Sequence, residues 1–154
     1  MNKEFVPYEL AVKLKTLGFD EPCFGYYVDG ELRGINLGIE ELGGIEPYYQ
    51  RFGFHTLNNH DIDNPNKIVV TAPTFSQVFR WFREKHNLRG FIGFRPNVKQ
   101  FDHHIYDMSL SGMEYVKQRT MVEYNKDPLV GTYEEAELAC LDKLIEIVEN
   151  EKTL

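Results

Sequence analysis

Apolar residues recur at helical spacing in three separate stretches of the chain. The first covers residues 7–18, where three leucines fall on one face of a helix with 3.6 residues per turn. Pro7 suits the first turn of a helix, and Gly18 suits its end because glycine readily adopts the left-handed conformation of a helix C-cap. This pattern predicts a helix over residues 7–18.

The second stretch, residues 74–90, contains the single tryptophan of the chain. Thr74 and Gln77 have the spacing of a capping box, and Pro73 opposes a helix that starts earlier. The side chains predicted to share the apolar face of this helix are Phe75, Val78, Phe79, Phe82 and His86. Trp81 lies off that face, so its ring should be partly exposed unless a ligand, a second subunit or a loop covers it.

The third stretch, residues 132–152, begins with another capping box, formed by Thr132 and Glu135. Its predicted apolar stripe consists of Leu141, Leu144, Ile145 and Val148. These features predict a helix near the end of the chain, with an acidic first turn that suits the positive end of the helix dipole.

Strand signals lie between the helices. Residues 23–37 predict a hairpin because Asp29-Gly30 is a strong two-residue turn signal. Tyr26 and Tyr27 alternate in this hairpin, so one ring should face the core and the other should face outward. Further strands are predicted over 48–55, 67–71, 90–96 and 99–110, while 113–125 fits either a strand or a short helix.

The order of these elements indicates the fold class. The strands cluster instead of alternating strictly with helices, which favours an α+β fold with a mainly antiparallel sheet. With 154 residues the chain fits one domain, residues 1–154. About one sheet carrying three helices on one face would bury the three apolar stripes.

Composition and charge narrow the class of protein. The net charge of -7 argues against binding to nucleic-acid polymers over the whole surface, although it leaves room for a local anion site. No apolar run has the length of a transmembrane helix, and the N-terminus lacks a signal-peptide core, so a cytosolic location is expected. Cys23 and Cys140 are expected to be reduced in that compartment.

Positive charge nevertheless concentrates between residues 80 and 99, where Glu84 is the only opposing charge. This segment could be a solvated helix face, or it could pair with the acidic third helix. It could also be an anion site with an aromatic wall, because arginine forks match phosphates and aromatic rings stack on bases. If this segment is an anion site, the candidate ligand-binding residues are Trp81, Arg80, Arg83, Lys85, Arg95 and Tyr49.

Candidates for catalysis and metal binding are weaker. His103 and His104 are adjacent in a predicted strand, so their rings should point to opposite faces, whereas Asp102 and His104 should share one. No paired metal-ligand spacing, nucleophile elbow or phosphate-binding glycine motif is present. The sequence therefore predicts no cofactor, no metal site and no catalytic residue, and it favours a protein that is not an enzyme.

Three stretches carry a resemblance: LKTLGFDEPCFGYY, APTFSQVFRWFREKHN and YEEAELACLDKLIEIV. Together they resemble a family of small uncharacterised proteins encoded mainly by phages and prophage-like elements of gut bacteria. The resemblance covers both ends and the central helix, but neither 32–70 nor 93–127. It implies a phage-type accessory protein in a bacterial cytoplasm, and it supplies no catalytic residues.

Two functions follow as hypotheses. In the first, the protein is a homo-oligomer that holds a small anionic, nucleotide-derived ligand without converting it, by analogy with small phage proteins that sequester host defence signals. In the second, it is an adaptor or inhibitor that binds a host protein, with Trp81 at the centre of the contact surface.

Overall fold

The computed structural model describes residues 2–34, 58–60, 66–109 and 129–151. In this part of the chain, three α-helices accompany antiparallel strands, so the predicted α+β class is confirmed. The chain divides into two compact units, Met1–Phe75 and Ser76–Leu154, and each is described by itself. The expectation of a single domain over 1–154 stays a prediction.

The strands among these residues form two sheets, where the sequence pattern predicted about one. Three strands pair in the order β2-β1-β3, and two others pair as β4-β5. All these pairings are antiparallel, which confirms that part of the prediction. The strands predicted over 48–55 and the ambiguous stretch 113–125 lie outside the described residues.

The first unit places one helix against a three-stranded sheet. Its elements are the 3-10 helix η1 (Asn2–Glu4), α1 (Tyr8–Leu17), β1 (Gly25–Val28), β2 (Glu31–Gly34) and β3 (Val69–Ala72). Helix α1 ends at Gly18, whose φ of 95° lets its N–H donate to the carbonyls of Leu14 and Lys15. The predicted helix and its C-cap are therefore confirmed.

The turn between β1 and β2 has the predicted residues and conformation. Asp29 and Gly30 have φ values of 50° and 88°, as a two-residue turn that follows the twist of its strands requires. Asp29 also ties this hairpin to the next strand, because its Oδ1 accepts a hydrogen bond of 3.0 Å from the Ile68 N–H. The hairpin prediction is confirmed.

Both tyrosines of β1 are buried, which corrects the expectation that one of them faces outward. Tyr26 is 0% and Tyr27 is 7% exposed. The reason is that both faces of β1 are covered, since all four of its residues are buried. The Tyr27 hydroxyl donates a 2.7 Å hydrogen bond to the Val6 carbonyl, so its polar end is satisfied inside the unit.

Cys23 and Cys140 are both buried and carry free thiols. Burial raises the pKa of the Cys23 thiol from 9.0 to about 12. Because the reactive form of cysteine is the thiolate, this shift lowers the reactivity of Cys23 in the folded protein.

Raising the pH above 9 is therefore expected to destabilise the protein through Cys23. The folded state keeps the thiol proton up to about pH 12, whereas the unfolded chain releases it near pH 9. The contribution of Cys23 is thus complete below pH 9, and above it falls by about 1.4 kcal/mol per pH unit. Urea unfolding at pH 8, 9 and 10 measures this slope. Cys23→Ala should flatten it, and an unchanged slope in that variant would assign the loss to other groups.

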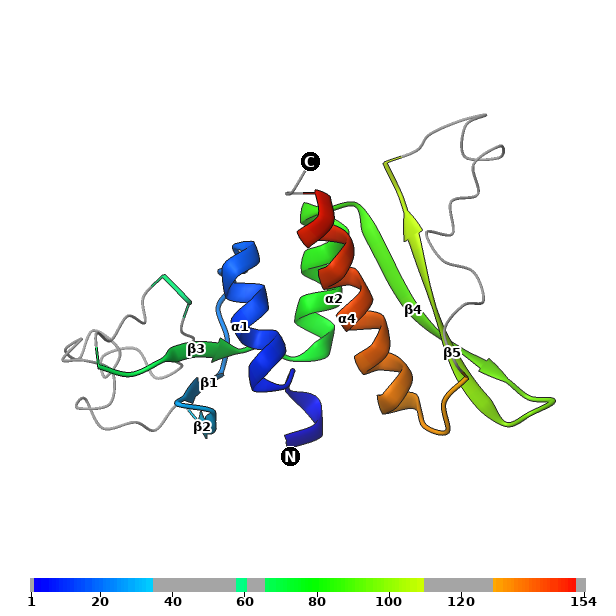
Figure 1. Ribbon diagram of the computed structural model, residues 1–154, viewed down its shortest axis with the longest axis horizontal. Coiled ribbons are helices and arrows are strands. Elements are labelled where there is room, and N and C mark those ends of the chain that lie inside the picture. Colours follow the sequence, from blue (N-terminus) through cyan, green and yellow to red (C-terminus); the bar gives the residue numbers. More distant parts are fainter. Residues whose placement is uncertain (1, 35–57, 61–65, 110–128, 152–154) are drawn as a thin grey trace. The chain divides into compact units, whose positions relative to one another are not determined.

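The second unit packs helices on one face of a hairpin. Its elements are α2 (Phe75–Lys85), β4 (Leu88–Arg95), β5 (Gln100–Asp107) and α4 (Tyr133–Glu151). In Figure 1, α4 runs beside the hairpin, in agreement with the contacts between α4 and both strands. Helix α4 begins with the predicted capping box: Glu135 N–H donates to Thr132 Oγ1, and Thr132 N–H donates to Glu135 Oε2.

The buried face of α2 differs from the predicted one. Val78, Trp81 and Phe82 are buried, whereas Phe79 is only half-buried. The stripe is thus rotated toward Trp81, whose indole packs edge-on against Phe82 and His86 at centroid distances of 5.0 and 4.7 Å. The expectation that the Trp81 ring is partly exposed is wrong, since only 4% of it is accessible.

Candidate functional site

The β4–β5 hairpin has two unlike faces, because successive residues of a strand point to opposite sides. The inner face packs on the helices: a Cβ at Gly90 would lie 2.7 Å from Cys140 Sγ and 2.9 Å from Phe79 Cε1. The opposite side, called the outer face below, consists of Arg89, Phe91, Gly93, Arg95, Gln100, Asp102, His104 and Tyr106. The outer face thus combines charged, polar and aromatic side chains.

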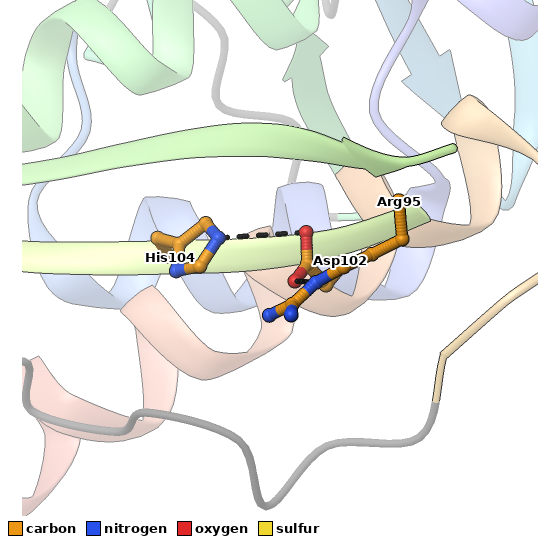
Figure 2. Close-up of polar contacts among 3 residues, drawn as sticks. All are labelled: Arg95, Asp102 and His104. Atoms are coloured by element: carbon orange, nitrogen blue, oxygen red, sulfur yellow. Dashed lines mark hydrogen bonds and ion pairs between the residues drawn. The ribbon is translucent and has the colours of Figure 1, made fainter. Parts of the chain in front are cut away.

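A carboxylate lies at the centre of this face. Asp102 Oδ2 accepts a 2.6 Å hydrogen bond from Arg95 Nε, and Asp102 Oδ1 lies 3.4 Å from His104 Nε2 (Figure 2). The side chains of Asp102 and His104 are only 12% and 15% exposed, whereas Arg95 is 39% exposed. Asp102 therefore holds two side chains in place, one of them a cation that solvent can reach.

Gly93 makes this arrangement possible. It lies opposite Asp102 in the hairpin, and a Cβ at position 93 would overlap Asp102 Oδ1 and lie 3.1 Å from His104 Nε2. Both side chains thus lean across the bare backbone of β4, where any larger residue would displace them. Because Gly93 has no side chain, the Asp102 carboxylate can lie close to the backbone of β4, within reach of Arg95.

An aromatic stack adjoins the polar group. Phe91 stacks on His104 with centroids 4.9 Å apart and on Tyr106 with centroids 5.3 Å apart and planes only 6° from parallel. Phe91 is 39% exposed. The outer face therefore offers solvent an aromatic ring and, further along the same strand, a guanidinium group.

The arrangement suits binding better than proton transfer. A general base must present an accessible nitrogen to its substrate. In His104, Nε2 is turned toward Asp102, and Nδ1 is buried. The imidazole is therefore part of the support of the site, and Phe91 and Arg95 are the groups that a ligand can reach.

The structure brings together only part of the predicted ligand-binding set. Arg95 lies on the outer face, while Phe79 of α2 contacts the inner face of the same strand. Arg80, Arg83 and Lys85 are exposed on α2, as expected, and Trp81 beside them is buried. Their role in ligand binding stays a prediction. Tyr49 lies outside the described residues.

Sequence reasoning named Arg95 as a candidate and placed Asp102 and His104 on one face, but it missed the aromatic residues of this site. Asp102 and His104 share a face, as the two-residue period predicted, and the register places His103 on the other one. Phe91 and Tyr106 were not among the candidates, although the same period places each of them on that face. The missing information was the register between the strands, which sets Phe91 against His104.

Among the described residues, no three His, Cys, Asp or Glu side chains come together in the way that holding a metal ion requires. None of the helices that these residues form combines the length and the apolar character needed to cross a bilayer.

Comparisons with known proteins add no relative: no family model, no curated protein and no solved structure matches this chain. The function must therefore be argued from the site itself.

Proposed function

We propose that the protein binds a small anionic ligand with a flat ring, such as a nucleotide-derived signal, on the outer face of the β4–β5 hairpin, and does not convert it. One observation carries this proposal: Phe91 and the side chain of Arg95 are both 39% exposed on the same face. Asp102 lies between these two positions and orients the arginine by accepting a hydrogen bond from its Nε. A ring can stack a base, and a guanidinium can pair with a phosphate.

The spacing of the two groups fits such a ligand. Arg95 reaches back to Asp102, which lies one pair of the outer face away from Phe91 and His104. Neighbouring pairs on one face are about 7 Å apart, since a strand rises about 3.4 Å per residue. Stacking at Phe91 and ion pairing at Arg95 can therefore act on one molecule that has a base and a phosphate.

Asp102 also explains how a guanidinium can serve as a specific contact. A guanidinium has five N–H donors in a planar fork, and a hydrogen bond from Nε fixes the plane of that fork. Fixing it beforehand reduces the entropy that would be lost when a ligand binds. Because Asp102 offsets part of the positive charge, the ring contact at Phe91 must contribute to affinity as well.

The biological setting is part of the proposal. The resemblance of three stretches to phage-encoded proteins suggests a role in a bacterial cytoplasm, where the ligand would be a host signal that the protein sequesters. We include a homo-oligomeric state in this proposal, as the sequence analysis expected. The rival hypothesis, an adaptor that binds a host protein, is one outcome of the test below.

Substitution of either ligand-contacting residue is expected to weaken binding at least about fivefold. Phe91→Leu keeps an apolar side chain but removes the ring, and Arg95→Gln removes the charge; each loss corresponds to about 1–3 kcal/mol. Calorimetric titration with a panel of mono-, di- and cyclic nucleotides measures the effect. Arg80→Gln, an exposed arginine of α2, is the matched control and should change affinity less than about twofold.

The outcomes separate the hypotheses. If Arg80→Gln abolishes binding and the hairpin variants do not, the ligand belongs on α2 and the hairpin proposal is wrong. Mass spectrometry of material released by heating should recover the added nucleotide unchanged. A product of different mass would mean an enzyme, and no bound nucleotide from the whole panel would favour the host-protein adaptor.

A further inference from the structure

Large apolar side chains are exposed together where the hairpin passes the start of α4. Phe94 and Phe101 form a cross-strand pair with ring centroids 5.0 Å apart, and Tyr133 packs edge-on against Phe101 at 6.1 Å. Val130 bridges to Phe101 through two backbone hydrogen bonds of 2.9 and 3.0 Å, which holds the chain just before α4 against β5. These three side chains, Phe94, Phe101 and Tyr133, are called the aromatic patch.

The patch is unusually open for such residues. Phe94 is 54% and Tyr133 is 48% exposed. Single exposed apolar residues are common, but a contiguous group of three aromatic rings marks a contact surface. It lies on the opposite face of the hairpin from Phe91, so it is separate from the proposed ligand site.

Charge is divided across the patch. Beyond Phe94, the end of the hairpin carries Lys99, which is positive. On the other side, the first turns of α4 carry Glu134 and Glu137, which are negative. Glu137 lies close to the patch, because burial and then the charge of Glu137 raise the pKa of Tyr133.

An apolar centre with opposite charges on its two sides is complementary to itself. A two-fold rotation about the centre places the positive side of one copy over the negative side of the other, and it does so twice. A partner with uniform charge would meet repulsion on one side. A second copy of this chain carries the same two charged sides and therefore matches both at once.

We infer that two copies of this chain associate through the aromatic patch about a two-fold axis, with the hairpin end of each copy facing the start of α4 in the other. This inference gives a surface to the homo-oligomer proposed above, and it does not depend on ligand binding. The rings of Phe94 and Tyr133 supply most of the contact, while the charges select the orientation.

Sedimentation velocity of the full chain between about 1 and 100 μM tests the inference. The wild type is expected to sediment as a dimer of 18.0 kDa chains at the upper end of this range. Phe94→Ser should raise the dimer dissociation constant at least about tenfold. Phe24→Ser is the matched control, since Phe24 is also 54% exposed but lies in the first unit, and it should leave the dimer unchanged.

Exchange of charge provides the second, independent measurement. Lys99→Glu and Glu134→Lys should each weaken the dimer, because each sets like charges against one another, and the two substitutions in one chain should restore it. A monomeric wild type at 100 μM, a Phe94→Ser variant as dimeric as Phe24→Ser, or a double variant no better than the singles would overturn the inference. Calorimetry with nucleotides is measured separately, so a failed dimer and a failed ligand site are distinguishable.

Discussion

Phe82→Ala is expected to lower the free energy of unfolding by about 3–5 kcal/mol, the range for a large aromatic side chain deleted from a core. Phe82 is 0% exposed, and its ring packs against the Trp81 indole and lies 5.7 Å from the His86 ring. Truncation would remove these contacts and leave a cavity between α2 and the rest of its unit. Urea denaturation followed by circular dichroism measures the change.

Two further variants make this result specific. Phe24→Ala is the exposed control, because Phe24 is 54% exposed and most surface substitutions change stability by less than about 0.5 kcal/mol. Phe79→Ala should cost less than Phe82→Ala, because Phe79 is only half-buried. If Phe79→Ala cost more, the buried face of α2 would be centred where the sequence pattern placed it, and the rotation described above would be wrong.

Gly90→Ala is expected to destabilise the protein by about 1–3 kcal/mol, as overpacking of a tight core does. The added Cβ would lie 2.7 Å from Cys140 Sγ, 2.9 Å from Phe79 Cε1 and 3.2 Å from Leu144 Cδ1. Two of these distances are too short for carbon in contact with its neighbours, so β4 would have to move away from both helices. Thermal denaturation and urea titration both report this loss.

The cause can be isolated with a second substitution. Cys140→Ala removes the nearest atom, so Gly90→Ala should cost less in that background than in the wild type, and the difference is the coupling between the two positions. Gly131→Ala is the matched control, because its Cβ would meet only Glu135 Oε2 at 3.7 Å. A cost at Gly90 equal to that at Gly131 would contradict the close packing of β4 on the helices.

Local features of the protein could be predicted because their causes are local. Asp29-Gly30 forms a tight turn since both residues tolerate a positive φ, and Gly18 ends its helix for the same reason. Thr132 and Glu135 cap α4 through bonds between residues three apart. None of these features depends on what the rest of the chain does.

The functional face is a different case, since it depends on how strands pair. The two-residue period placed Asp102 and His104 on one side, and the structure agrees. That Arg95 reaches Asp102, and that Phe91 stacks on His104, follows from the register between β4 and β5. A shift of that register by one residue would move each of these contacts to the other face, and no short stretch of sequence specifies it.

The sequence by itself determined the α+β class, the end of α1 at Gly18, the cap at the start of α4, the turn at Asp29-Gly30 and the shared face of Asp102 and His104. Tertiary structure alone decided that Tyr26 and Tyr27 are both buried, because both faces of β1 are covered. It also decided that Trp81 belongs to the core of α2. A helical period places residues on faces, but only the neighbouring elements decide which face is covered. Because an indole ring has a large apolar surface, its burial stabilises the fold more than its exposure would.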